Sequence, residues 1–228
     1  MAWPEVMARL DSGATAILPV GAECKEHGPH LPMNTDYLQA QWLAASVVQQ
    51  ADVVVWPVLG YGYYPGFVDY PGSCSLSRAT FSATVADIVS GIGQAGARRV
   101  RILNTGLSTI EPLQQVIEQA VGFKSIVLLN VYDGRHYRAA AMETQQQARG
   151  GHADELETSI MLAIDPDRVD MRKAVACIER PIQGRFNRSD PQAPNYSPSG
   201  VYGDPTLASA DKGRRLLCAM IADIVEAL

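Results

Sequence analysis

The sequence predicts an α/β fold of three αβα layers around a mostly parallel central sheet. Short runs rich in Val, Ile and Leu alternate with longer amphipathic stretches along the 228 residues. A strand–helix–strand–helix order favours a parallel sheet with helices on both faces. The length fits one domain, 1–228, which can bury roughly 70% of the surface of its unfolded chain.

The first half of the chain supplies two strands and the helix between them. Residues 14–20 form the first apolar run and predict a strand. Residues 37–50 predict a helix, with Asp36 as a possible cap. Residues 52–58 are nearly all apolar, which is typical of a strand buried on both faces.

The same alternation continues through the middle of the chain. Residues 80–95 have a helical pattern that stops at Gly96, a plausible helix C-cap. Further strands are predicted over 99–104 and 125–131, with a helix over 111–121 between them.

Two segments depart from this alternation. Residues 60–72 are rich in Gly, Pro and Tyr and predict an ordered loop, whereas residues 180–205 predict a surface excursion before the last helix. Ligands of parallel sheets bind beyond the carboxyl ends of the strands. We therefore expect the residues after Val20, the tyrosine-rich loop and Asn104 to meet in one place.

Composition excludes several classes of partner. The formal net charge is −5, which argues against a nucleic-acid or anionic-membrane partner. No apolar run reaches the ~18 residues that cross a bilayer. The first ten residues lack the layout of a secretory signal, so a cytoplasmic location is expected.

The first polar cluster follows the first predicted strand. It reads K-E-H-G-P-H-L-P over 25–32, and Asp36 follows closely. Imidazole and carboxylate groups on a rigid Gly/Pro loop suit a divalent metal ion. The alternative is a polar loop in which Asp36 merely caps the next helix, but capping accounts for neither His27 nor His30.

The second polar cluster reads H-A-D-E-L-E-T-S over 152–159. If a helix begins here, His152 and Glu155 share one face at a spacing of i, i+3. Glu157 then falls among apolar residues and needs hydrogen-bonding partners. We expect Glu155 to face the site and Glu157 to be a buried strut. The alternative is an ordinary acidic helix start, favoured by the helix dipole.

In sequence these motifs resemble the creatininase family, which includes creatinine amidohydrolases, deformylases and peptide-processing relatives. The matching segments are L-P-V-G-A at 18–22, E-H-G-P-H-L-P at 26–32, P-G-S-C-S-L at 71–76, N-T-G at 104–106, H-A-D-E-L-E-T-S at 152–159, and G-D-P through K-G at 203–213. The resemblance implies a creatininase-like amidohydrolase domain over 1–228. It also implies a homo-oligomer, possibly a hexamer.

The family holds two metal ions, and the resemblance implies that this chain lacks ligands for one of them. Lys25 stands where the family has a glutamate two residues before His27. Leu107 stands where the family has a later histidine. One extra residue separates Gly21 from His27, so Glu26 can instead occupy the missing ligand's place.

The resemblance implies that the other ion keeps its ligands, His27, Asp36 and Glu155. We expect one divalent ion per subunit, Zn²⁺, Mn²⁺ or Fe²⁺, with the Lys25 ammonium replacing the second cation.

The predicted function is hydrolysis of a C–N bond, in an amide, cyclic amide or formamide, of a small polar substrate by metal-activated water. His152 is the candidate proton shuttle. Candidate substrate-binding residues are His30, Tyr63, Asn104 and Ser108. The alternative is a catalytically silent protein that binds a metal or small ligand on the same scaffold. The sequence contains no Gly-rich phosphate loop of the kind that would indicate a nucleotide cofactor.

Overall fold

The four strands form one parallel sheet. The computed structural model describes residues 1–178 and 185–228; the part of the predicted surface excursion at 180–184 lies outside the described residues. The strands are β1 (Thr15–Val20), β2 (Val53–Val55), β3 (Arg99–Asn104) and β4 (Ser125–Asn130), in the order β2-β1-β3-β4. All three pairings are parallel, which confirms the predicted sheet.

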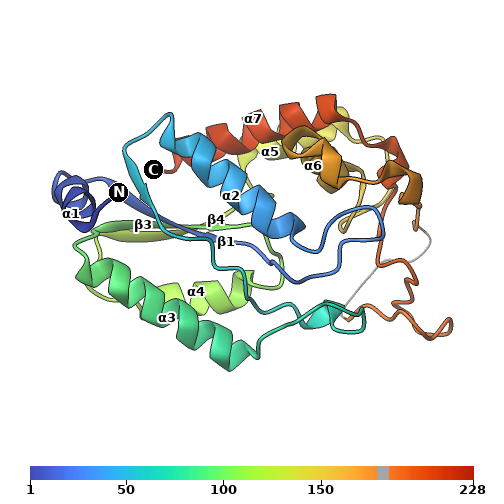
Figure 1. The fold of residues 1–228 in the computed structure, drawn as a ribbon, viewed down its shortest axis with the longest axis horizontal. Coiled ribbons are helices and arrows are strands. Elements are labelled where there is room, and N and C mark those ends of the chain that lie inside the picture. Colours follow the sequence, from blue (N-terminus) through green and yellow to red (C-terminus); the bar gives the residue numbers. More distant parts are fainter. Residues whose placement is uncertain (179–184) are drawn as a thin grey trace.

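Helices cover both faces of the sheet (Figure 1). One face carries α2 (Thr35–Val48), α5 (Arg135–Thr144), α6 (Glu155–Ile164) and α7 (Ala210–Glu226). The other carries α3 (Arg78–Gln94) and α4 (Ile110–Gln119), while α1 (Trp3–Asp11) packs near the start of the sheet. The three predicted layers are therefore confirmed. In the described part of the chain, no helix combines the length and the apolar character that spanning a membrane requires.

The two hydrophobic cores share the central strand. All six residues of β1 are buried. Ala16 and Leu18 pack with Phe81 and Leu113 in the core under α3 and α4. Ile17 points the opposite way, into the core under the other helices. This period-two alternation explains why a strand buried on both faces has an unbroken apolar sequence.

The carboxyl ends of β1 and β3 create the place where the site forms. The chain leaves β1 through α2 on one face of the sheet and returns from β2 to β3 through α3 on the other. Such a switch of direction leaves a crevice at the strand ends. Thr105, just after β3, donates from its hydroxyl to the Asp36 carbonyl at 3.0 Å. A Cβ on Gly21 would lie 2.4 Å from that same carbonyl oxygen, so the approach requires glycine.

Helices α6 and α7 also approach each other closely. A Cβ added to Gly213 of α7 would lie 1.9 Å from the carbonyl oxygen of Ser159 in α6. The backbone amide of Ser209 donates to the Ser159 hydroxyl at 3.1 Å just before α7 begins. The start of α7 is therefore fixed against the start of α6.

This close approach predicts that Gly213→Ala destabilises the protein, because the two helices must separate to admit the methyl group. We expect a loss of about 1–3 kcal/mol in the free energy of unfolding, measured by urea denaturation. Gly91→Ala is the matched control, since a Cβ on Gly91 in α3 meets nothing within 4 Å. That control should gain about 0.5–1 kcal/mol. Equal stability of Gly213→Ala and the unmodified chain would contradict the prediction.

Candidate active site

His27 lies at the centre of the loop that follows β1. Its ring is buried, with Nδ1 2.9 Å from the Lys25 carbonyl oxygen and Nε2 2.9 Å from Asp36 Oδ1. A carbonyl oxygen can only accept, so Nδ1 carries a hydrogen. In the neutral ring Nε2 then offers a lone pair toward a carboxylate. Two acceptors this close need a proton or a metal ion between them or beside them.

Lys25 holds the other oxygen of the Asp36 carboxylate. The Lys25 ammonium lies 2.7 Å from Asp36 Oδ2, and its side chain is 8% exposed. The ammonium also lies 4.8 Å from the centre of the Phe67 ring. Burial alone would raise the pKa of Asp36, but Lys25 and His27 outweigh it and hold this pKa well below its ordinary value.

The second cluster does not begin as a helix. Ala153 has φ of 48°, Asp154 is extended, and α6 starts only at Glu155. Asp154 caps that helix, since its Oδ1 accepts the amides of Leu156 and Glu157 at 3.0 Å. His152 precedes the turn and pairs with Tyr202 through backbone hydrogen bonds. His152 and Glu155 therefore do not share a helix face.

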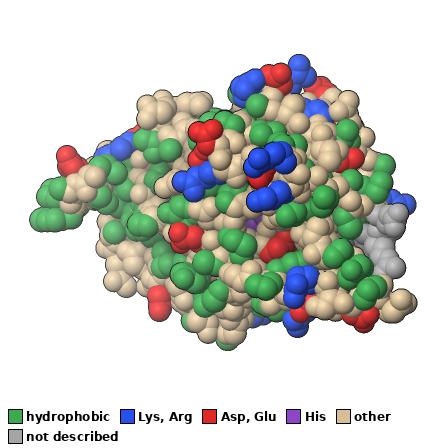
Figure 2. Space-filling view, turned by 45° about the vertical axis from the view of Figure 1, so that its right-hand side comes forward, with side chains coloured by type: hydrophobic (Ala, Val, Ile, Leu, Met, Phe, Trp, Pro, Cys, Tyr) green, Lys and Arg blue, Asp and Glu red, His purple; other side chains and the backbone are tan. Residues whose placement is uncertain are grey.

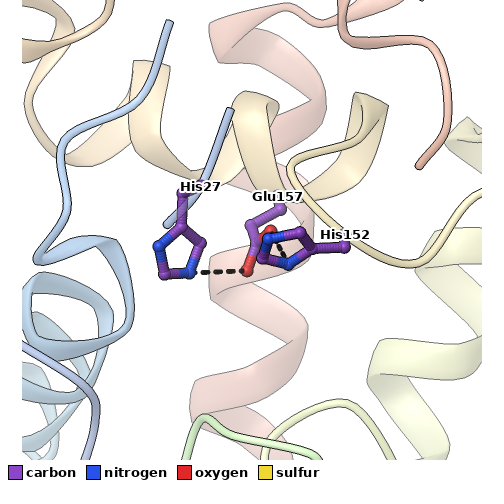
Figure 3. A group of neighbouring side chains, drawn as sticks. All are labelled: His27, His152 and Glu157. Atoms are coloured by element: carbon purple, nitrogen blue, oxygen red, sulfur yellow. Dashed lines mark ion pairs between the residues drawn. The ribbon is translucent and has the colours of Figure 1, made fainter. Parts of the chain in front are cut away.

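The predicted placement of the two glutamates was wrong. Glu155 is fully buried away from the histidines, accepts the amides of Gln146 and Gln147, and pairs with Lys212. Glu157 instead lies between the two imidazoles, as Figure 3 shows. Its oxygens are each 3.8 Å from a ring nitrogen, one of His27 and one of His152.

The sequence did contain a signal for the direction of the Glu157 side chain. A D-x-x-E pattern at a helix start is typical of a cap whose glutamate reaches back toward the preceding backbone. Here Glu157 Oε2 accepts the amide of Ala153 at 2.6 Å, which turns its side chain out of the helix core.

His27, His152 and Glu157 form a group that can hold a cation. One potential ligand atom from each lies within 4.8 Å of the others, and the imidazole centres are 5.0 Å apart. Two imidazole nitrogens and a carboxylate oxygen suit Zn²⁺ or Mn²⁺. The residues present therefore fit a single divalent ion, and the lone pair of His27 Nε2 provides an independent reason for one.

Glu26 orients His152 rather than joining this group. His152 Nε2 lies 3.0 Å from the Glu26 carbonyl oxygen and 3.2 Å from its carboxylate. Nε2 therefore carries a hydrogen, while Nδ1 faces Glu157. Burial alone would lower the pKa of His152, but Glu26 raises it above its ordinary value. Burial would likewise raise the pKa of Glu26, and His152 outweighs it, so that pKa is lowered. The structure does not place Glu26 at the missing ligand's position.

A pocket of about 320 Å³ opens beside the group. Its charged and imidazole lining comes from Lys25, His152, Asp154 and Glu157, and Phe67 and Leu156 contribute part of its apolar lining. In Figure 2 a small area of histidine is visible in the middle of one face, beside acidic and hydrophobic side chains. The pocket is large enough for a small organic molecule.

The fold and the sequence identify the family together. The family model described as "Creatininase: Creatinine amidohydrolase" matches residues 1–228. This chain belongs to the creatininase family. The predicted resemblance is confirmed, and membership makes the chain an enzyme of the hydrolase type found in this family.

Three relatives illustrate the similarity. The creatinine amidohydrolase of Pseudomonas putida is 29% identical over 249 residues, which cover 100% of this chain and 94% of the relative. The mycofactocin precursor peptide peptidase of Mycolicibacterium smegmatis is 29% identical, with 90% and 80% covered. A solved structure titled "Creatininase Mn" superposes with a TM-score of 0.87 at 27% identity, covering 100% of this chain and 95% of that one.

Three predicted substrate-binding residues line the creatininase pocket or the space beside it. Ser108 lines both the main pocket and an adjoining cavity of about 20 Å³. Tyr63 and Asn104 line only the small cavity. Asn104 also organises its own loop, because Oδ1 accepts the Thr109 hydroxyl at 2.7 Å. Leu107, at the position where the resemblance implies a histidine, is 60% exposed.

His30 is not among the described residues that line the main pocket. It is buried, and its Nε2 lies 2.8 Å from the Thr158 hydroxyl in α6. Nδ1 has no hydrogen-bond partner among the described residues. Burial lowers the pKa of His30 to about 4. Its contacts indicate a link between the motif loop and α6.

The lowered pKa of His30 predicts acid sensitivity. As the pH falls below ~6.5, this histidine becomes protonated in the unfolded chain but stays neutral in the native protein until pH ~4. Protonation therefore favours the unfolded state, and the free energy of unfolding falls across this window. His30→Asn should remove on the order of 2 kcal/mol of that decline, measured by urea unfolding between pH 7 and 4. His136→Asn, on exposed His136 of α5, is the control. An unchanged pH slope in His30→Asn would refute the prediction.

Proposed function

We propose that this creatininase-family enzyme is a metal-dependent hydrolase that cleaves the C–N bond of an amide, cyclic amide or formamide in a small polar substrate. The observation that carries the proposal is Glu157 held between His27 and His152 at the side of the pocket. Family membership favours an enzyme over a catalytically silent binding protein. Assembly into a homo-oligomer stays a prediction.

We assign the cation to His27, Glu157 and Asp36, and not to His152, because the raised pKa of His152 favours the protonated ring, which has no lone pair for a metal ion. His27 Nε2 is 2.9 Å from Asp36 Oδ1 and 3.8 Å from Glu157 Oε1, so both carboxylates are within reach of one imidazole nitrogen. A divalent ion held there supplies Lewis-acid polarisation of a carbonyl and activates water near neutral pH. Asp36 Oδ2 is already held by the Lys25 ammonium, which supports one ion rather than two.

His152 is proposed to carry the proton to the departing nitrogen. Its Nε2 is fixed by Glu26, and its Nδ1 faces the pocket side of Glu157. The raised pKa keeps a larger fraction of the ring protonated near neutral pH than an ordinary histidine. A positioned proton donor of this kind contributes about 10²–10⁴-fold to a rate.

Lys25 is proposed to stabilise negative charge on the reacting carbonyl group. Its ammonium lines both cavities, and Phe67 shields one side of it. A fixed cation in a site with little water stabilises a developing anion more strongly than it would in solution. Ser108, which lines both cavities, is a candidate for a further hydrogen bond to substrate.

The metal content of single-residue variants should distinguish the residues that bind the ion from those that only lie near it. After the protein is loaded with Mn²⁺ or Zn²⁺ and dialysed, we expect about one equivalent of metal per chain, measured by elemental mass spectrometry. Glu157→Gln should lose most of this metal, since it removes a charged ligand. Glu155→Gln and His152→Asn should retain it, the latter with turnover reduced about 100-fold or more.

The substrate class is tested with cyclic amides, lactams and formamides, with and without added metal. Turnover that depends on the metal and disappears in Glu157→Gln supports the proposal. Two tightly bound equivalents per chain, or full turnover in metal-free protein, would contradict it.

Lys25→Met tests the ammonium separately. The substitution keeps the length of the side chain and removes the charge, so kcat should fall about 100-fold with metal content unchanged. Lys173→Met is the control, because Lys173 lies on the surface, with its side chain 62% exposed. Full turnover in Lys25→Met would show that the ammonium does not stabilise charge on the reacting carbonyl group.

A further inference from the structure

One motif of the chain remains outside the catalytic group. The segment G-D-P through K-G at 203–213 leads into α7, and within the described part of the chain its side chains form no hydrogen bond or ion pair with His27 or Glu157. Lys212 instead reaches the start of α6. Its ammonium contacts the Glu155 carboxylate, the Gln146 side-chain oxygen at 2.7 Å and the Leu207 carbonyl at 2.8 Å.

The partner of this pair holds one wall of the pocket. Residues 145–151 have no helix or strand, and four of them, Gln145, Gln147, Gly150 and Gly151, line the pocket. The Glu155 carboxylate accepts the amide of Gln146 at 2.9 Å and the amide of Gln147 at 2.6 Å. At the far end the Gly151 amide donates to the Tyr202 carbonyl at 3.0 Å.

The Gln147 side chain strengthens the same connection. Its oxygen accepts the amides of Glu155 at 3.3 Å and Asp204 at 2.9 Å. Its nitrogen donates to Asp154 Oδ2 at 2.7 Å, and Asp154 caps α6. The wall, the start of α6 and the segment before α7 therefore form one hydrogen-bonded unit.

A charge argument makes Lys212 the essential member of this unit. Glu155 is 0% exposed, and Lys212 is its only cationic partner among the ion pairs of the described residues. Without the ammonium the buried carboxylate is left with an uncompensated charge and must rearrange, which weakens its hydrogen bonds to the two amides. The close approach at Gly213 leaves α7 little freedom to place the ammonium elsewhere.

We propose that the Glu155–Lys212 ion pair is a positioning device that holds the wall 145–151 in its substrate-binding conformation, so that α7 sets the affinity of the pocket. The pair does not touch the proposed cation ligands. Its effect on substrate rests on the proposed function; its effect on the wall does not.

Lys212→Met tests the proposal, with Arg214→Met as the matched control on the same helix. Arg214 pairs with Asp211 at the surface, where the two side chains are 62% and 85% exposed. In Lys212→Met, amide hydrogen exchange of a peptide covering 145–151 should become about tenfold faster, relative to peptides from β1 and β3. KM should rise about tenfold, because the pocket wall is no longer held in place, while kcat changes less than about twofold. A tenfold loss of affinity corresponds to about 1.4 kcal/mol.

Further variants keep the test decisive. Lys212→Arg retains the charge and should restore both KM and slow exchange. If Lys212→Met does not fold, Glu155→Gln replaces it and should show the same local effect with metal content retained. Unchanged exchange of 145–151, or equal acceleration of every peptide, would overturn the proposal. Absence of metal binding or turnover in the unmodified enzyme would overturn the proposed function instead, and the exchange measurement would still decide this inference.

Discussion

The carboxylates of Glu26, Asp36 and Glu157 outnumber the single ammonium of this site, and that imbalance decides what else the site must hold. The side chains of Glu26, Asp36 and Glu157 are 7%, 2% and 12% exposed, and that of Lys25 is 8% exposed. With neutral imidazoles the group carries two excess negative charges. Buried charge without compensation costs several kcal/mol. Protons on the two imidazoles or one divalent cation would each restore neutrality, so proton and metal compete for the same place.

The same charge balance supports the proposal of a single ion. Lys25 stands where the resemblance implies a glutamate. Replacing a carboxylate by an ammonium adds two positive charges, which equals the charge of one divalent cation. The ammonium lies 2.7 Å from the Asp36 oxygen that faces away from His27. A second metal ion on that side of Asp36 would meet a cation rather than a ligand, and electrostatic repulsion would exclude it.

The sheet was predictable from sequence because its strands lie in short runs rich in Val, Ile and Leu that alternate with helical stretches. β1, β3 and β4 begin and end within one residue of the predicted ranges. The α5 helix was not predicted; its sequence, R-H-Y-R-A-A-A-M-E-T, buries only Tyr137 and Thr144, so no apolar stripe marks it. The group formed by His27, His152 and Glu157 was predictable only in part. Its histidines lie in evident motifs, but the choice between the glutamates depends on backbone conformation.

That choice failed at one residue. A helical wheel drawn from His152 assumes continuous helix, whereas Ala153 takes a left-handed φ of 48° and resets the direction of the chain. Non-glycine residues seldom adopt this region, and periodicity gives no sign of it.

His30 illustrates a different limit of prediction from sequence. His30 follows His27 by three positions, but the turn at 28–30 changes the direction of the chain, and the ring of His30 meets α6 instead of the pocket.

The spacing of the catalytic group depends on contacts between the two motifs rather than within either one. His152 reaches Glu26 across 126 residues of sequence, and His30 reaches Thr158 across 128. These two bonds lie on either side of Glu157 in sequence and tie its surroundings to the loop that carries His27. Glu157 is further held by the Ala153 amide. Its distance to each imidazole is thus set by the fold before any ion arrives, and a ligand set fixed in advance loses little entropy on binding.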